Sequence, residues 1–283
     1  MEYKTVTETK MLYLSTQSSS CTLLNGDFKS KAQYQLGTQM NFRNDPTIMH
    51  VEVSMPYVVL TNSNYIINST NNVLAIGVGG VTSSYVFEQG NYGVSQFVAA
   101  FTALVPNTFG ITFDNVNSKF SVSNSASAFT LLGSSTIDFV MGFSTDLAST
   151  STAPYTVTMP RVCNFLPIPR FLIHCDVLNN GVVTSSSNGF QQSSDVLATI
   201  PNSSRQTTQI AFVNTQSGFQ LRNYDLTSLV ISIMDDNGAL IDFNGISSYF
   251  SLKFVITRVV QKIPTTFHQA IALASQTFPD DSV

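Results

Sequence analysis

The chain has 283 residues, of which only 11% are charged, and its 13 Lys and Arg against 17 Asp and Glu give a formal net charge of −4. This weak acidic charge disfavours binding to nucleic acid or to an anionic membrane, since both need clustered Lys and Arg. The chain begins Met-Glu-Tyr-Lys, and no run approaches the ~20 apolar residues of a membrane-spanning helix, so we expect neither a signal peptide nor a membrane span.

The sequence of residues 1–60 predicts an extended arm followed by two strands. Residues 1–30 show no sustained period, and we expect an extended arm with one short strand near Met11–Leu14. A strand is predicted at 31–36. In 49–60 apolar and polar residues alternate, which is the pattern of a half-buried strand. Within it, Pro56 marks an edge, a bulge or a crossing between sheets.

The segment from Val94 to Val105 changes to the period of a helix. Its apolar residues fall at i, i+3, i+4, i+7, i+10 and i+11, which places them along one stripe, and Pro106 ends the helix. Two interpretations remain open. The helix packs over the sheets of the domain, which we favour, or its stripe is a docking surface for a partner.

Further elements are short and closely spaced. A hairpin is predicted from 65–68 and 73–76, and a short helix over 136–141 is capped by Ser134 or Ser135 and stopped by Gly142. Other strands are expected at 84–88, 110–114, 119–123, 128–132, 155–159, 171–177, 196–200, 209–213 and 219–221.

The stretch from Asp225 to Thr257 contains two strands with a period of two, separated by turn residues. Asn237-Gly238 predicts a type I′ hairpin turn and Asn244-Gly245 a second reversal, so we expect a hairpin that closes the sandwich. After Pro264, apolar residues at helical spacing predict a short amphipathic helix over 266–276.

About ten short strands with one or two brief helices predict an all-β fold, an antiparallel β-sandwich of the single jelly-roll type. We expect an N-terminal arm at 1–30, one jelly-roll domain at 31–258 and a C-terminal tail at 259–283. Composition shows no break that divides the domain.

The sequence predicts no catalytic, cofactor-binding or metal-ligating residue, and therefore no enzyme. His50, His174 and His268 lie far apart, and His174 and its neighbour Cys175 should point to opposite faces of a strand. Asp235-Asp236-Asn237-Gly238 resembles a calcium loop, but Ile233 occupies the position of the first ligand, so a hairpin turn is favoured.

Other polar and reactive groups have structural explanations. Gly77-Val-Gly-Gly80 lacks the third glycine of a dinucleotide-binding loop. Caps and Asx-turns account for the carboxylates at Asp138, Asp176, Asp225, Asp235 and Asp242. An odd count of three cysteines, Cys21, Cys163 and Cys175, indicates reduced thiols, although one disulfide remains open. A sugar-binding patch is disfavoured, because the chain has no Trp and no exposed aromatic cluster is evident.

Five segments together resemble the single-jelly-roll minor capsid proteins, including the penton proteins, of icosahedral double-stranded DNA viruses with double-jelly-roll major capsid proteins: nucleocytoplasmic large viruses, virophages and polinton-like elements. The segments occur in the same order and cover about residues 50–257. They are Glu88–Leu104, Phe129–Phe143, Ile173–Leu178, Asp195–Pro201 and Met234–Gly245. A Trp expected near the last strand is replaced by Ser247-Ser248-Tyr249.

The resemblance implies a penton subunit at the fivefold vertex of the virion, assembled as a homopentamer inside the host cell. Its implied partners are the major capsid protein and other minor capsid proteins, without cofactor or nucleic acid. Two alternatives stay open: a peripheral minor capsid protein beneath or between major capsomers, and a receptor- or carbohydrate-binding sandwich of a spike.

Overall fold

The computed structural model describes residues 2–17, 19–37, 40, 42, 45–178, 183–185, 191–193, 195–215, 218–221, 224 and 226–262. The residue contacts divide the chain into two compact units. Unit 1 comprises Met1–Asn62 and Arg170–Val283, and unit 2 is the intervening stretch Ser63–Pro169. The expected domain at 31–258 therefore contains two separate cores. Composition did not reveal this division, because both units bury the same kinds of β-favouring residue.

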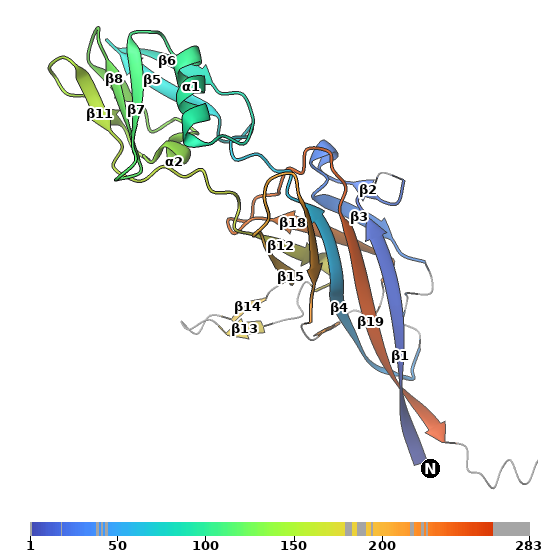
Figure 1. Cartoon of the computed structure of the whole chain (residues 1–283). Coiled ribbons are helices and arrows are strands. Elements are labelled where there is room, and N and C mark those ends of the chain that lie inside the picture. Colours follow the sequence, from blue (N-terminus) through green and yellow to red (C-terminus); the bar gives the residue numbers. More distant parts are fainter. Residues whose placement is uncertain are drawn as a thin grey trace, which may run out of the picture. The chain divides into compact units, whose positions relative to one another are not determined.

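Unit 1 is a sandwich of two antiparallel sheets (Figure 1). Its first sheet has the order β1-β19-β4-β16, with β17 also paired to β4, and its second has the order β15-β12-β18-β3-β2. The strands are β1 (Glu2–Ser15), β2 (Thr22–Leu23), β3 (Lys31–Gln35), β4 (Ile48–Thr61), β12 (Arg170–Cys175), β15 (Val196–Pro201), β16 (Gln209–Val213), β17 (Phe219–Gln220), β18 (Ser228–Met234) and β19 (Tyr249–Lys262). Unit 1 also contains a small separate pair, β13 (Val183–Ser185) with β14 (Gln191–Ser193), and the 3₁₀ turns Gly26–Phe28 and Asp176–Leu178.

The strand order is that of a jelly roll. In chain order the eight main strands are β1, β3, β4, β12, β15, β16, β18 and β19. One sheet holds the first, eighth, third and sixth of them, and the other holds the fifth, fourth, seventh and second. Apart from the fourth and fifth, neighbours within each sheet are not consecutive among the eight strands, which is the two-Greek-key arrangement of a jelly roll. The predicted fold class is confirmed.

The interior of unit 1 is filled by apolar side chains from alternate positions of the facing strands. These positions are fully or almost fully buried because each strand turns one side toward the opposite sheet. They include Val51, Val53 and Met55 of β4, Phe171 and Ile173 of β12, Leu229, Ile231 and Ile233 of β18, and Phe250, Leu252, Phe254 and Ile256 of β19.

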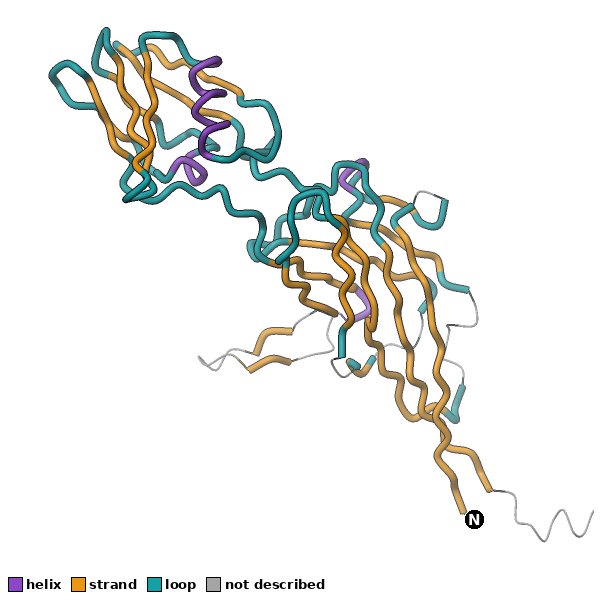
Figure 2. Tube along the Cα trace, viewed as in Figure 1, coloured by secondary structure: helices purple, strands orange, loops and turns teal. Residues whose placement is uncertain are grey.

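Unit 2 is a smaller β structure inserted after β4. Its two sheets have the orders β10-β9-β5-β6 and β11-β8-β7. Figure 2 shows its strands in orange and its helices in purple. The elements are β5 (Val73–Val78), β6 (Val81–Val86), α1 (Val94–Leu104), β7 (Phe109–Asp114), β8 (Lys119–Asn124), β9 (Phe129–Leu131), α2 (Asp138–Met141), β10 (Leu147–Ala148) and β11 (Tyr155–Thr158). The helix α1 buries Phe97 and Phe101 in the core of this unit, which supports the packing interpretation of its apolar stripe.

Two local predictions need correction. Residues 2–15 form the strand β1 and pair with β19 along their whole length, so this part of the expected arm belongs to the sandwich. The strand β5 pairs with β6 across Gly79 and Gly80, which both have positive φ, and not with 65–68, where Ile67 makes an isolated bridge to Gly90. Glycines at both turn positions make that closer hairpin the easier one to form.

The β18 and β19 strands also do not form the predicted hairpin. The β18 strand pairs with β3 and β12, whereas β19 pairs with β1 and β4 in the other sheet. Residues 235–248 are long enough to cross from one sheet to the other. Only Gly238 has positive φ at the first turn, which excludes type I′ there, while Asn244 and Gly245 both have positive φ at the second.

Two further predictions concern single residues. At Pro56 the pairing of β4 with β19 shifts register, so Pro56 lies at a bulge and needs no N–H donor there. The helix α2 ends at Gly142 in the left-handed conformation as predicted, but no side chain caps its start. Ser135 instead binds the backbone of Ala75 and Leu132. The predicted tail helix at 266–276 lies outside the described residues.

Candidate functional site

The outer face of the β1-β19-β4-β16 sheet carries an exposed cluster of tyrosine and valine side chains, here called the tyrosine face. Strand register sets Tyr13 opposite Ser251, Ser251 opposite Tyr57, and Tyr57 opposite Val213. These four residues form one row across the sheet. Their neighbours Leu14, Phe250 and Val58 are buried, so the row points away from the core.

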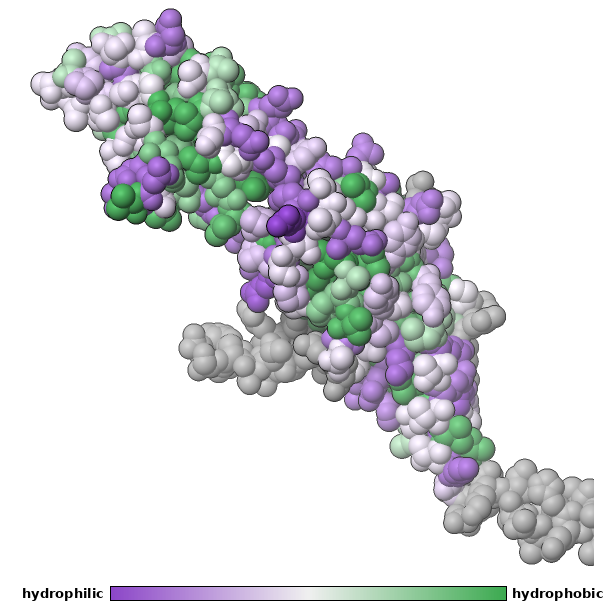
Figure 3. Space-filling view, viewed as in Figure 1, coloured by the Kyte–Doolittle hydropathy of each residue, from purple (hydrophilic) through white to green (hydrophobic). Residues whose placement is uncertain are grey.

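A second row lies beside the first and adds a third tyrosine. Tyr249 is opposite Ser15 on one side and Val59 on the other, and Val59 is opposite Ala211. The exposed fractions are 78% for Tyr13, 44% for Tyr57 and 47% for Tyr249. Figure 3 shows hydrophobic surface gathered over β4 and β16 on this face.

No exposed aromatic cluster was expected from the sequence, and that expectation was wrong. Tyr13, Tyr57 and Tyr249 are separated by long stretches of chain and meet only because β1 and β4 both pair with β19. Tyr13 and Tyr249 each alternate with a buried apolar neighbour, Leu14 and Phe250, and this alternation was the signal available in the sequence. Tyr57 gave no such signal, because it has the same parity as the buried Val51, Val53 and Met55 and faces outward only after the bulge at Pro56. Rigid amphipathic rings of this kind are enriched in protein interfaces.

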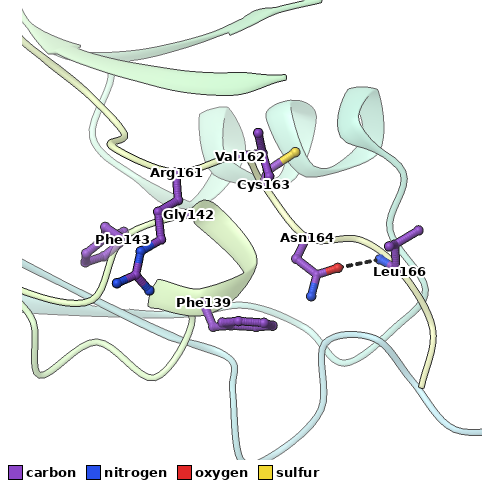
Figure 4. A pocket seen from close by; sticks show the side chains of 8 residues that line it. All are labelled: Phe139, Gly142, Phe143, Arg161, Val162, Cys163, Asn164 and Leu166. Atoms are coloured by element: carbon purple, nitrogen blue, oxygen red, sulfur yellow. Dashed lines mark hydrogen bonds between the residues drawn. The ribbon is translucent and has the colours of Figure 1, made fainter. Parts of the chain in front are cut away.

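Unit 2 has an apolar pocket of about 310 Å³, here called the α2 pocket. It lies between α2 and the segment 161–166, and Figure 4 shows Phe139 on the helix side and Asn164 on the segment side. Three of its apolar side chains are largely exposed: Phe139 at 64%, Val162 at 57% and Leu166 at 78%. The remaining lining residues are Gly142, Phe143, Arg161, Cys163 and Asn164.

Backbone hydrogen bonds hold the wall of the α2 pocket in place. Arg161 N donates to Gly142 O at 3.0 Å, and Asn164 N donates to Val140 O at 2.9 Å. Gly142 is required there, since a Cβ would lie 2.5 Å from Arg161 O. Burial raises the pKa of the Cys163 thiol, so this cysteine is a weak nucleophile near neutral pH.

A second, more polar pocket of about 340 Å³ lies on the outer face of the β18 sheet. His174 Nδ1 is 2.7 Å from Asp195 Oδ1. Asp176 Oδ1 accepts a hydrogen bond from Val230 N at 2.7 Å, and desolvation raises the pKa of the Asp176 carboxyl. The pairing of His174 with Asp195 fixes the orientation of the imidazole. Asp195 was not singled out from the sequence, where it lies 21 residues away.

His174 and Cys175 point to opposite faces, as predicted. Cys175 is fully buried, and desolvation raises the pKa of its thiol to about 12. The three cysteines are free thiols in the structure. His50 lies elsewhere, with Nε2 3.1 Å from Thr257 Oγ1.

Asp235 and Asp242 occupy the turn positions expected of them, whereas Asp138 does not form the expected cap. Asp235 Oδ1 accepts hydrogen bonds from Asn237 N and Ala239 N, and Asp242 Oδ1 accepts one from Asn244 N, as in Asx-turns. Asp138 lies in the first turn of α2. His268 and Asp225 lie outside the described residues. Over the described ranges, no group of three or more His, Cys, Asp or Glu side chains comes together, and no helix has the length and apolar character to cross a membrane.

No protein-family model matches the chain, and no curated protein sequence matches it. Among solved structures, it is similar to the crystal structure of the selenomethionine-labelled mavirus penton protein, with 10% identity and a TM-score of 0.41. The matched region covers 92% of this chain and 100% of that chain. The jelly-roll assignment rests on the strand order of unit 1 and not on this similarity.

Proposed function

We propose that the chain is a structural subunit of an icosahedral viral capsid and that it forms the fivefold vertex as a pentamer. The observation that carries the proposal is the jelly-roll strand order of unit 1. Jelly rolls build viral capsids, lectins and cupins, so the fold by itself does not choose between them. The ordered resemblance of five sequence segments to minor capsid proteins favours the capsid.

The packing of unit 1 supports a building block over a cupin-like pocket protein. Its inward positions hold large apolar side chains with almost no exposed area, so the space between the sheets is filled. The groups left for interaction therefore lie on the outer surfaces. A subunit of this kind acts through its shape and its contacts.

The tyrosine face is the part of unit 1 best suited to contact another copy. Tyr13, Tyr57 and Val213 present apolar area on a rigid sheet, and no charged side chain lies in their row. A closed ring of five repeats one heterologous contact around its axis. Under this proposal the tyrosine face meets a different surface of the next subunit. The major capsid protein and other minor capsid proteins would then border the ring in the virion.

Native mass spectrometry of the purified chain tests the proposal. We expect a pentamer for the wild-type chain, and a shift to monomer for Tyr13→Ser combined with Tyr57→Ser, because the central aromatic contacts are lost. Tyr65→Ser is the matched control, since Tyr65 is exposed in unit 2 and lies outside the tyrosine face. A wild-type chain that stays monomeric at high concentration would argue against a vertex pentamer.

A position beneath or between major capsomers is the alternative within the same class. In a reconstruction of the particle, density for this chain away from the fivefold axes would select it. The expected absence of enzymatic activity and of nucleic-acid binding stays a prediction.

The tyrosine face also favours a second candidate function, a carbohydrate-binding sandwich of a spike. Aromatic rings on an exposed sheet offer flat apolar surfaces against which a sugar ring can pack. A glycan array separates the two: a hit that Tyr13→Ser abolishes would support the spike, while an array without hits removes it.

A further inference from the structure

We propose that the α2 pocket binds residues 278–283 from a second copy of the chain. This segment has the sequence Phe-Pro-Asp-Asp-Ser-Val and lies beyond Lys262, the last residue that the structure describes. The inference concerns contact between copies and stands whether or not the assembly is a capsid.

The chemistry of the pocket matches that of the segment. The exposed side chains of Phe139, Val162 and Leu166 offer apolar area, and Phe278 is an apolar aromatic group of suitable size for it. An aromatic anchor in an apolar pocket is the usual centre of a tight contact. Left empty, the pocket would keep three large apolar side chains in water.

Charge complementarity points the same way. Arg161 is the charged residue among those lining the pocket, and its side chain is exposed. Asp280 and Asp281 lie two and three residues after Phe278 and are the acidic residues of the chain beyond Lys262. With Phe278 in the pocket, both carboxylates are within reach of the guanidinium, and Arg pairs readily with carboxylates.

The lengths involved favour a segment from another copy. The strand β19 runs about 43 Å from Tyr249 to Lys262, at ~3.3 Å per residue. Unit 2 departs from unit 1 after Thr61, at the Tyr249 end, since Tyr249 pairs with Val59. Residues 263–277 span at most about 52 Å. Of the at most about 52 Å that residues 263–277 can span, about 43 Å is needed to go back along β19 to the end where the chain passes into unit 2.

Photo-crosslinking on the full chain tests the proposal. Phe278 is replaced by p-benzoylphenylalanine, and this chain is mixed with ¹⁵N-labelled wild-type chain before irradiation. We expect crosslinks from the light segment to heavy peptides covering residues 139–166. Crosslinks to other regions, crosslinks only within one copy, or none at all would each overturn the proposal.

Charge reversal gives the matched test. Arg161→Glu should lower the crosslink yield about tenfold, since two attractive pairs become repulsive. Adding Asp280→Arg and Asp281→Arg to it should restore the yield to within about threefold of the starting level. Arg205→Glu, a change at an exposed arginine of unit 1, should leave the yield unchanged. A triple variant as low as Arg161→Glu alone contradicts the ion pairs, and so does an equal loss with Arg205→Glu.

The Leu166→Ser variant separates loss of binding from loss of the folded structure. Leu166 is 78% exposed, so the variant should keep the thermal midpoint of the wild-type chain. It should still lose most of the crosslinking, because it removes apolar area from the pocket. A full crosslink yield in a folded Leu166→Ser chain would show that the segment binds elsewhere.

Discussion

Replacing Phe97 by alanine removes the centre of the aromatic cluster in unit 2. The Phe97 ring is fully buried and lies 5.0 Å from Phe87, 5.3 Å from Phe165 and 5.4 Å from Phe120, measured between ring centroids. Large-to-small changes at such sites cost about 3–5 kcal/mol. The Phe97 ring contacts place the cost of Phe97→Ala near ~4 kcal/mol, because each aromatic pair adds ~0.5–1.5 kcal/mol beyond its buried area.

The division of contacts into two units makes the loss local. About 4 kcal/mol corresponds to a ~10³-fold loss of protection against amide hydrogen exchange. We expect this loss in β5, β8 and α1 of unit 2, with β4 and β19 of unit 1 unchanged. Hydrogen exchange followed by mass spectrometry measures the protection of the backbone amides of both units in one sample.

The control for this prediction lies on the same helix. Leu104 is 38% exposed, so Leu104→Ala should cost under ~1 kcal/mol. If Phe97→Ala lowers protection in β19 as much as in α1, the two units unfold together and the reasoning fails. An equal effect from Leu104→Ala would also refute it.

Two further substitutions test other parts of the account. Gly142→Ala should destabilise unit 2 by at least ~2 kcal/mol in urea unfolding, because φ is +96° and the Cβ would lie 2.5 Å from Arg161 O. Gly79→Ala, with φ +56° and nothing within 4 Å of its Cβ, should cost less, and an equal cost refutes the clash. Hydrogen bonds from Thr47, then Arg258, lower the pKa of the Asp45 carboxyl below 3.8. Because the pKa of Asp45 is lower in the folded than in the unfolded chain, the ionised carboxylate stabilises the fold above about pH 4, and this stabilisation is lost as the pH falls. Asp45→Asn should therefore lose less unfolding free energy than wild type as the pH falls below about 4, and parallel curves would contradict this.

Most strands could be predicted from the sequence, because a period of two is a local property of each segment. The β4, β7 and β16 strands lie within a residue or two of their predicted bounds. The partners of the strands could not be predicted in the same way. In a jelly roll, most neighbours in a sheet are not consecutive in the chain, and here β18 and β19, adjacent in sequence, lie in different sheets.

The candidate sites depend on this non-local pairing. Tyr13, Tyr57 and Tyr249 belong to three strands that are joined only through β19, so no short motif identifies the tyrosine face. The α2 pocket is different, because its residues lie within one stretch from Phe139 to Leu166. The sequence predicted the short helix and its stop at Gly142, but not the return of residues 161–164 against it, which depends on backbone hydrogen bonds.

A reconstruction of the virus particle tests the central claim most directly. The proposal predicts five copies of this chain around each fivefold axis, with the jelly roll of unit 1 fitted to the density and the tyrosine face against a neighbouring copy. Vertices whose density cannot be fitted by this chain would contradict the proposal.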